Sequence, residues 1–221
     1  QYLRPPSKLF AVFFGGMSSR IAILASGAGT TAQSLLDAGR SGHLGEAEVV
    51  VLVSDRPDAP ALERARKAGV EALFVDASEY PDRVSYSEAL AKELQRRDVD
   101  LVCFAGFMKI LSPPFIRAFP NRILNTHAAL LPAFPGAHPV RDTLEWGVKV
   151  TGATIHLVDE EVDHGPIVLQ EAVPVLPTDD EEALHERIKQ LERRLYPEAV
   201  RAMVSGSVRI VGRKVLVGSG R

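Results

Sequence analysis

The sequence predicts a single α/β domain built on an open, mostly parallel, Rossmann-like sheet flanked by helices, with antiparallel strands toward the C-terminus. Two observations predict the parallel part of the sheet. Short apolar runs rich in Val, Ile and Leu alternate with helix-like segments along the first 125 residues. These runs also lack a polar alternation, as strands buried on both faces require. A third observation is that from residue 151 the strand-like stretches begin to alternate, which is typical of antiparallel strands with one wet face.

The predicted elements of the first part follow one another as strand and helix. Strands are expected over residues 21–25, 49–53, 73–75, 99–104 and 122–125, and helices over 30–38, 59–67 and 82–97. The second helix is stopped by Gly69, a residue that favours helix ends. The first strand runs into Ser26-Gly-Ala-Gly29 before its helix starts.

The later part adds two longer strands, a long helix and a terminal hairpin. Strands are expected over 151–158 and 167–175, bridged by a loop that contains Asp163-His-Gly-Pro166. A helix follows Asp179-Asp180, and its apolar face is formed by Leu184, Ile188, Leu191, Leu195 and Ala199. Residues 208–217 predict two short strands that turn at Gly212-Arg213.

Composition limits the kind of protein. At 221 residues, with 46% hydrophobic and 24% charged side chains, the chain suits one sizeable globular domain. A net charge of −2 gives no general attraction to nucleic acid or to an anionic membrane, so we expect neither as a partner. The single cysteine, Cys103, lies in an apolar run and cannot form an internal disulfide. We therefore expect a cytoplasmic protein.

The first residues stand apart from this pattern. The apolar run 9–14 is too short to span a bilayer and has poor flanks for a signal peptide. Met17 and the three residues after it precede a strand, as a natural start does. We expect residues 1–16 to be an N-terminal extension that need not be native, and residues 17–221 to form the domain.

The glycine-rich turn predicts an anion site. Gly27-x-Gly29-x-x-Ala32 joins a strand to a helix, so backbone N–H groups and the helix dipole favour negative charge there. Thr30 and Thr31 add hydroxyls that suit a terminal phosphate. A dinucleotide is the rival ligand, because Asp55 follows the second strand where a ribose-binding acid belongs. A tight turn without a ligand is the third reading, and the motif alone does not decide among them.

A second polar cluster lies at the end of the fifth strand. Asn125 and His127 point to the same face, because side chains alternate along a strand. Ligands of open α/β sheets bind at the carboxyl edge, where an amide and an imidazole can polarise a carbonyl and handle a proton. Each residue also has a purely structural reading, and Asp163 before His164-Gly165 can be a turn former.

Five ordered strings strengthen the functional reading. They are residues 105–112 (AGFMKILS), 125–127 (NTH), 130–132 (LLP), 134–136 (FPG) and 163–166 (DHGP). Together they closely resemble the glycinamide ribonucleotide formyltransferase (phosphoribosylglycinamide formyltransferase) family, the folate-dependent enzymes of purine synthesis. The resemblance covers about residues 20–211, and the ordered set is far more specific than any one string.

The resemblance implies a Rossmann-like formyltransferase fold and transfer of the formyl group of 10-formyltetrahydrofolate, as co-substrate, to the amine of glycinamide ribonucleotide. No metal is implied. It also implies roles for particular residues. Asn125, His127 and Asp163 would form the catalytic group; Gly29, Thr30, Thr31, Ala32 and Gln33 would surround the phosphate, with Glu192 near the glycinamide; Arg83, Met108, Lys109, Ile110, Leu111 and Asn125 would bind the folate, and residues 158–163 would wrap the pterin edge.

The sequence departs from the family pattern at a few positions. Thr31 stands where an Asn is common, Ala128-Ala129 where Pro-Ser is usual, and Ala133 where a longer residue is frequent. These changes affect the shape of the loops and leave the three catalytic residue types in place. His156 shares a strand face with Thr154 and is expected to support the reacting group from outside it.

Other activities remain as alternatives. Formyltetrahydrofolate deformylase and methionyl-tRNA formyltransferase share the catalytic set, but each usually carries an additional domain for which we expect no room here. A NAD(P)-binding oxidoreductase explains only the glycine loop and Asp55. A folate-binding protein without activity gives no reason for Asn125, His127 and Asp163 to occur together.

Overall fold

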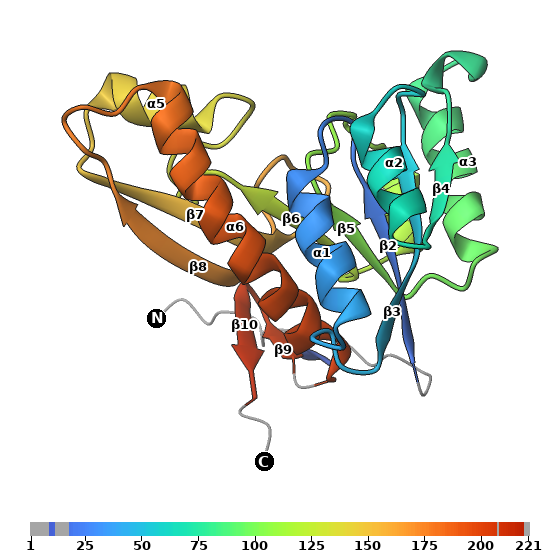
Figure 1. Cartoon of the computed structure of the whole chain (residues 1–221). Coiled ribbons are helices and arrows are strands. Elements are labelled where there is room, and N and C mark those ends of the chain that lie inside the picture. The colour runs from blue at the N-terminus through green and yellow to red at the C-terminus, as the bar shows by residue number, and fades with distance from the viewer. Residues whose placement is uncertain (1–8, 12–17, 207, 219–221) are drawn as a thin grey trace.

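The computed structural model describes residues 9–11, 18–206 and 208–218. Within them ten strands form one sheet in the order β1-β9-β10-β8-β7-β6-β5-β2-β3-β4, with helices packed against it (Figure 1). The predicted class, an α/β domain with a mostly parallel sheet and later antiparallel strands, is confirmed.

The parallel half of the sheet positions the site. Its strands are β2 (Ser19–Leu24), β3 (Ala47–Ser54), β4 (Glu71–Phe74), β5 (Leu101–Phe104) and β6 (Ile123–His127). All neighbouring pairs among them are parallel. Strand order runs outward from β2 in both directions, so the loops after β2 and β5 leave on opposite sides of the sheet. This is the point where open α/β sheets bind their ligands.

Helices cover both faces of this half. α1 (Thr30–Arg40), α2 (Pro60–Lys67) and α6 (Glu181–Val204) share a hydrophobic core with one face, and α3 (Arg83–Gln95) and α4 (Pro113–Ala118) share another core with the opposite face. The predicted apolar face of the long helix is confirmed, since all five of its residues are buried. Asp82 and Asp180 cap α3 and α6 by accepting hydrogen bonds from Ser85 N and Ala183 N.

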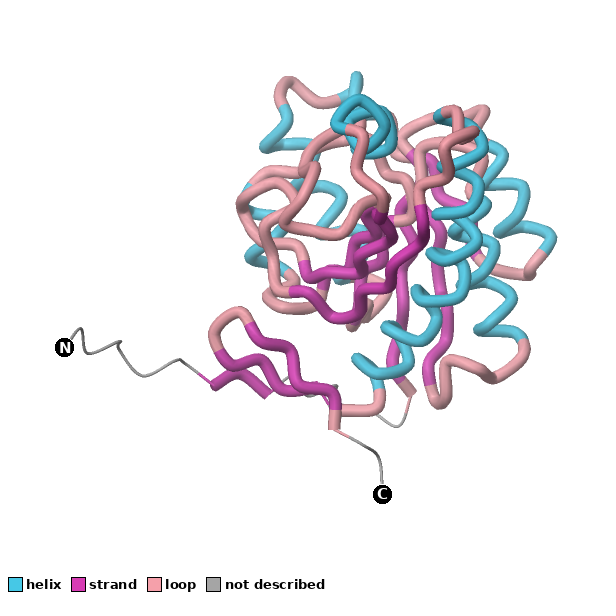
Figure 2. Tube along the Cα trace, turned by 90° about the vertical axis from the view of Figure 1, so that its left-hand side faces the viewer, coloured by secondary structure: helices cyan, strands magenta, loops and turns pink. Residues whose placement is uncertain are grey.

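The antiparallel half extends the sheet beyond β6. β7 (Val150–Leu157) pairs with β6, β8 (Ile167–Pro174) pairs with β7, and β9 (Val208–Val211) and β10 (Lys214–Val217) form the predicted hairpin. β1 (Leu9–Ala11) pairs with β9, so three residues of the expected extension join the sheet. The rest of that extension and the expected start at Met17 lie outside the described residues. Figure 2 shows the strands near the two termini set apart from the helices.

Short elements were not predicted. The 3₁₀ helix Ala77–Glu79, α4, α5 (Pro139–Trp146) and β1 have eight residues or fewer. α4 and α5 both begin with Pro, as the predicted α2 does, because proline is favourable in the first turn of a helix. Within the described residues, no helix is long and apolar enough to cross a membrane. Cys103 is a buried free thiol, and burial raises its pKa.

Candidate active site at the carboxyl edge of the sheet

The turn after β2 leaves backbone donors exposed at the start of α1. Gly29 is the N-cap and has a φ of 70°, a conformation that glycine adopts without strain. A Cβ on Gly29 would also lie 2.7 Å from Ala61 Cβ, so α2 packs too closely for any side chain there. The first helical bond runs from Gln33 N to Gly29 O, no side chain caps the helix, and its first turn has no acidic residue. The N–H groups of residues 30–32 therefore remain available for an anion.

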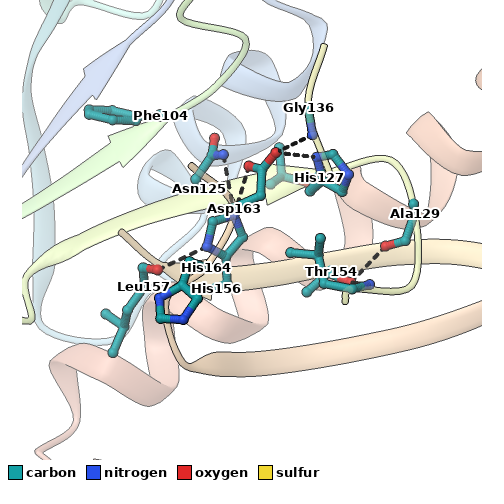
Figure 3. A network of polar contacts seen from close by, with 12 residues as sticks. Phe104, Asn125, His127, Ala129, Gly136, Thr154, His156, Leu157, Asp163 and His164 are labelled. Carbon is teal, nitrogen blue, oxygen red and sulfur yellow. Dashed lines mark hydrogen bonds and ion pairs between the residues drawn. The ribbon is translucent and has the colours of Figure 1, made fainter. Parts of the chain in front are cut away.

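The predicted catalytic residues come together in a polar network (Figure 3). His127 Nε2 lies 2.7 Å from Phe134 O, and because a carbonyl oxygen only accepts, Nε2 carries a hydrogen. His127 Nδ1 lies 3.4 Å from Asp163 Oδ2, which also accepts the Gly136 N–H at 2.8 Å. Both side chains are buried, so this contact is shielded from water.

His156 takes part in this network directly, which is more than the sequence suggested. Its Nδ1 lies 2.9 Å from Leu157 O and so carries the hydrogen. Burial lowers the pKa of His156, which keeps the ring neutral and leaves Nε2 as an acceptor. Asn125 Nδ2 lies 3.3 Å from that Nε2, so the neutral ring orients the carboxamide of Asn125 and leaves its second N–H free. Asp163 Oδ1, at 3.7 Å from Nε2, is therefore a neighbour rather than an ion-pair partner.

The chain between β7 and β8 places Asp163 over the end of β6. Asp163 itself has a φ of 53°, in the left-handed region that Asp tolerates better than most residues. A Cβ on Gly165 would lie 1.7 Å from Leu157 O, the same carbonyl that holds His156. Glycine at that position thus allows the loop to return against β7, which is a structural reason for the glycine in the string DHGP.

A second hydrogen-bonded group holds the loop 128–136, which supplies the acceptor for His127. Thr154 Oγ1 donates to Ala129 O at 2.7 Å and accepts from Leu131 N at 3.1 Å. Gln170 Nε2 donates to Leu131 O and to Thr154 Oγ1, both at 2.8 Å. Sequence analysis did not single out Gln170, because its partners lie 16 and 39 residues away.

Glu192 packs against strand β6 through Thr126. Its Oε1 accepts a hydrogen bond of 2.8 Å from Thr126 Oγ1. Thr126 alternates with Asn125 and His127, so Glu192 is on the face of β6 opposite to those two side chains. The side chain is almost fully buried in α6, and burial raises its pKa.

The predicted folate residues gather where α3 starts beside the loop after β5. Ser112 Oγ donates to Arg83 O at 3.0 Å, and Met108 N donates to Ser26 Oγ at 2.8 Å. Met108 and Ile110 are exposed, whereas Leu111 is buried. A cavity of about 490 Å³ opens next to this loop, lined by Ser26, Gly27, Asp55, Arg56, Met108 and Lys109. The anion turn, the polar network and this apolar loop thus share one edge of the sheet.

Known proteins resemble this chain along most of its length. The family model described as formyl transferase matches residues 19–200. Phosphoribosylglycinamide formyltransferase of Mycobacterium tuberculosis is 48% identical over 90% of this chain and 92% of its own. A crystal structure of glycinamide ribonucleotide transformylase 1 from Symbiobacterium toebii has a TM-score of 0.90 and 51% identity, covering 93% of this chain and 96% of its own. The human trifunctional purine biosynthetic protein adenosine-3 is 38% identical over 89% of this chain, which corresponds to 19% of that longer protein.

Proposed function

This chain belongs to the formyl transferase family, and we propose that it transfers the formyl group of 10-formyltetrahydrofolate to the amine of glycinamide ribonucleotide. One observation supports this particular reaction in addition to membership of the family. A helix start with free backbone N–H groups lies at the same edge of the sheet as an Asn-His-Asp cluster in which the His127 and Asp163 side chains are buried. A phosphorylated amine and a formyl donor need that combination. A nicotinamide cofactor is not favoured by the comparisons.

The phosphate is proposed to bind the N–H groups of residues 30–32, with Gly29 and Gln33 at either end of that turn. The first turn of α1 has no acidic residue, so the anion meets the positive end of the helix dipole without a repelling carboxylate. Anchoring the phosphate there lets the amine reach toward β6. Holding two reactants in the right geometry replaces a bimolecular encounter and can supply much of the rate.

The reaction itself needs an oxyanion donor and a proton carrier. The substrate amine attacks the formyl carbon, and the carbonyl electron pair moves to oxygen in a tetrahedral intermediate. Asn125 would donate its second N–H to that oxygen, a contact whose loss typically costs about 10² to 10³ in rate. His127, fixed between Phe134 O and Asp163, would place its imidazole beside the same oxygen.

Asp163 would move the proton. In this proposal its carboxylate takes the proton lost by the attacking amine, directly or through one water, and returns it to the folate nitrogen as the C–N bond breaks. The products are then formylglycinamide ribonucleotide and tetrahydrofolate.

Arg83 and residues 108–111 are proposed to bind the folate. For Glu192 we keep the proposal that it lies near the glycinamide, acting through Thr126 on β6. We place the reaction in the cytoplasm, consistent with an enzyme whose single cysteine stays a free thiol.

The deciding experiment separates transfer from hydrolysis. Formyl-folate should be consumed rapidly only when glycinamide ribonucleotide is present, and formate release without the amine should be slow. Asp163→Asn, which keeps an acceptor for Gly136 N–H but removes the charge, should lower kcat about 100-fold or more with little change in folate affinity. Rapid formate production that does not depend on the ribonucleotide would favour the deformylase instead.

A further inference from the structure

Arg64 of α2 is bonded to both ends of the anion-binding turn. Its Nε donates to Ala28 O at 2.8 Å, just before Gly29. Its Nη1 donates to Gln33 Oε1 at 3.1 Å, just after Ala32. One guanidinium therefore brackets the segment 29–32, whose N–H groups face the proposed phosphate site.

The charge of Arg64 is not neutralised by a neighbouring carboxylate. Within the part of the chain that the structure describes, Arg64 forms no ion pair, while Arg66 and Lys67 on the same helix both pair with Glu63 and Arg56 pairs with Asp58. The two oxygens that accept hydrogen bonds from Arg64 are both neutral. Arg64 is half-buried and is held by neutral groups, so no neighbouring negative charge offsets its attraction for a bound anion.

The packing of α2 explains how Arg64 reaches this position. Ala61 N donates to Gly27 O at 3.3 Å, and the Ala61 side chain lies against Gly29. Arg64 follows Ala61 by one helical turn and so lies on the same face. Its Cδ would be 3.4 Å from a Cβ on Gly29, so the side chain passes directly over the turn.

We propose that Arg64 determines specificity for a phosphorylated amine, because it adds a full positive charge to the anion site that the helix N-terminus begins. This inference rests on the proposed function and assigns Arg64 a part in recognising the phosphate. Its contribution is greatest for a substrate that carries the dianion and vanishes for one that does not. A purely structural brace would serve both kinds of substrate equally, and this difference makes the two roles separable.

The test compares glycinamide ribonucleotide with glycinamide ribonucleoside, which lacks the phosphate. Arg64→Met removes the charge while keeping an unbranched side chain. It should raise the KM for the ribonucleotide about tenfold, as expected for loss of a charged hydrogen-bonding partner, and leave kcat/KM for the ribonucleoside unchanged. Arg66→Met, whose guanidinium pairs with Glu63 on the same helix, is the matched control and should change neither value. Arg64→Lys keeps the charge and should preserve most of the preference for the ribonucleotide.

Binding of inorganic phosphate, measured by calorimetry at low salt, tests Arg64 independently of turnover. Affinity should fall about tenfold in Arg64→Met and stay unchanged in Arg66→Met, and the difference should shrink as salt rises. Equal losses on the ribonucleotide and the ribonucleoside, or unchanged phosphate affinity, would overturn the inference. Failure of the wild-type protein to transfer formyl groups would instead refute the proposed function, and the phosphate measurement would still decide the role of Arg64.

Discussion

Two buried histidines in this site are given different roles by the carbonyl groups that hold them. His156 donates from Nδ1 to Leu157 O, so its Nε2 is left to accept from Asn125. His127 donates from Nε2 to Phe134 O, so its Nδ1 faces Asp163. Two side chains of the same type, on the neighbouring strands β6 and β7, thus have different partners: one orients an amide and the other meets a carboxylate.

Glu192 is a buried carboxyl group whose ionisation is disfavoured in the folded protein. Because burial raises its pKa in the folded protein, the charged form is disfavoured there. Its contribution to stability is fully present below the pKa of the unfolded chain, near 4.3, and is lost as the pH rises through the folded value. Glu192→Gln keeps an oxygen for Thr126 Oγ1 and removes the charge.

We expect Glu192→Gln to raise the midpoint of thermal unfolding by a few degrees at pH 7 and to match the wild type near pH 4. The same change should impair use of glycinamide ribonucleotide, as residues kept for function often cost stability. Unfolding scans between pH 4 and 8 measure the first effect, with the exposed Glu198→Gln on the same helix as the control. A lower midpoint at pH 7 would mean that the carboxylate form is favourably held.

At the scale of elements, sequence patterns predicted the helices and strands whose residues follow a regular burial pattern. Buried strands such as β2 and β5 and the apolar face of α6 were predictable because their periodicity is a direct consequence of burial. α4 and α5 were not, because α4 has only six residues and α5 follows the run 132–138, whose Pro and Gly residues indicate a loop. Asn125, His127 and Asp163 could be proposed as catalytic from local strings, whereas Arg64 and Gln170 could not be singled out, because their hydrogen-bond partners lie far along the chain. Such pairings depend on tertiary packing, which periodicity does not encode.

Gln170 gives a prediction about how β8 supports the loop 128–136. Both amide hydrogens of its Nε2 are used, on Leu131 O and Thr154 Oγ1, and the Thr154 proton is already donated to Ala129 O. Gln170→Glu would therefore set a carboxylate against two acceptors, release the loop and move Phe134 O away from His127. We expect kcat to fall about tenfold or more, because small misplacements of catalytic groups are costly.

Two comparisons separate this effect from general destabilisation. Activity of Gln170→Glu should partly recover at lower pH, where the carboxylic acid regains one hydrogen to donate. Glu171→Gln, at the next position of β8 and paired with Arg194, should leave kcat unchanged. If Gln170→Glu turned over like the wild type at pH 8, the loop would not need this support.

Across the whole molecule, the site joins two halves of one sheet. The parallel half provides the turn before α1 and the loop after β5, and the antiparallel half provides His156 and the segment with Asp163. α6 connects them, since it packs against α1 and β6 of the parallel half and against β7 and β8 of the antiparallel half. A ligand that contacts both halves should therefore stabilise the molecule as a unit, and this makes global unfolding a measure of where each substrate binds.

The change Thr30→Asp uses this property to locate the phosphate. An acidic residue in the first turn of α1 interacts favourably with the helix dipole, so the ligand-free variant should unfold at or slightly above the wild-type temperature. The same carboxylate repels a phosphate bound to the N–H groups of residues 30–32.

In wild type, glycinamide ribonucleotide at about 100 times its Kd should add roughly 2.7 kcal/mol of stability, or about 5–10 °C for a protein of this size. Thr30→Asp should lose that shift and keep the shift produced by 10-formyl-dideazafolate, while the uncharged Thr30→Ser should keep both. Scanning calorimetry in phosphate-free buffer measures all three proteins. A full ribonucleotide shift in Thr30→Asp would place the phosphate somewhere other than the start of α1.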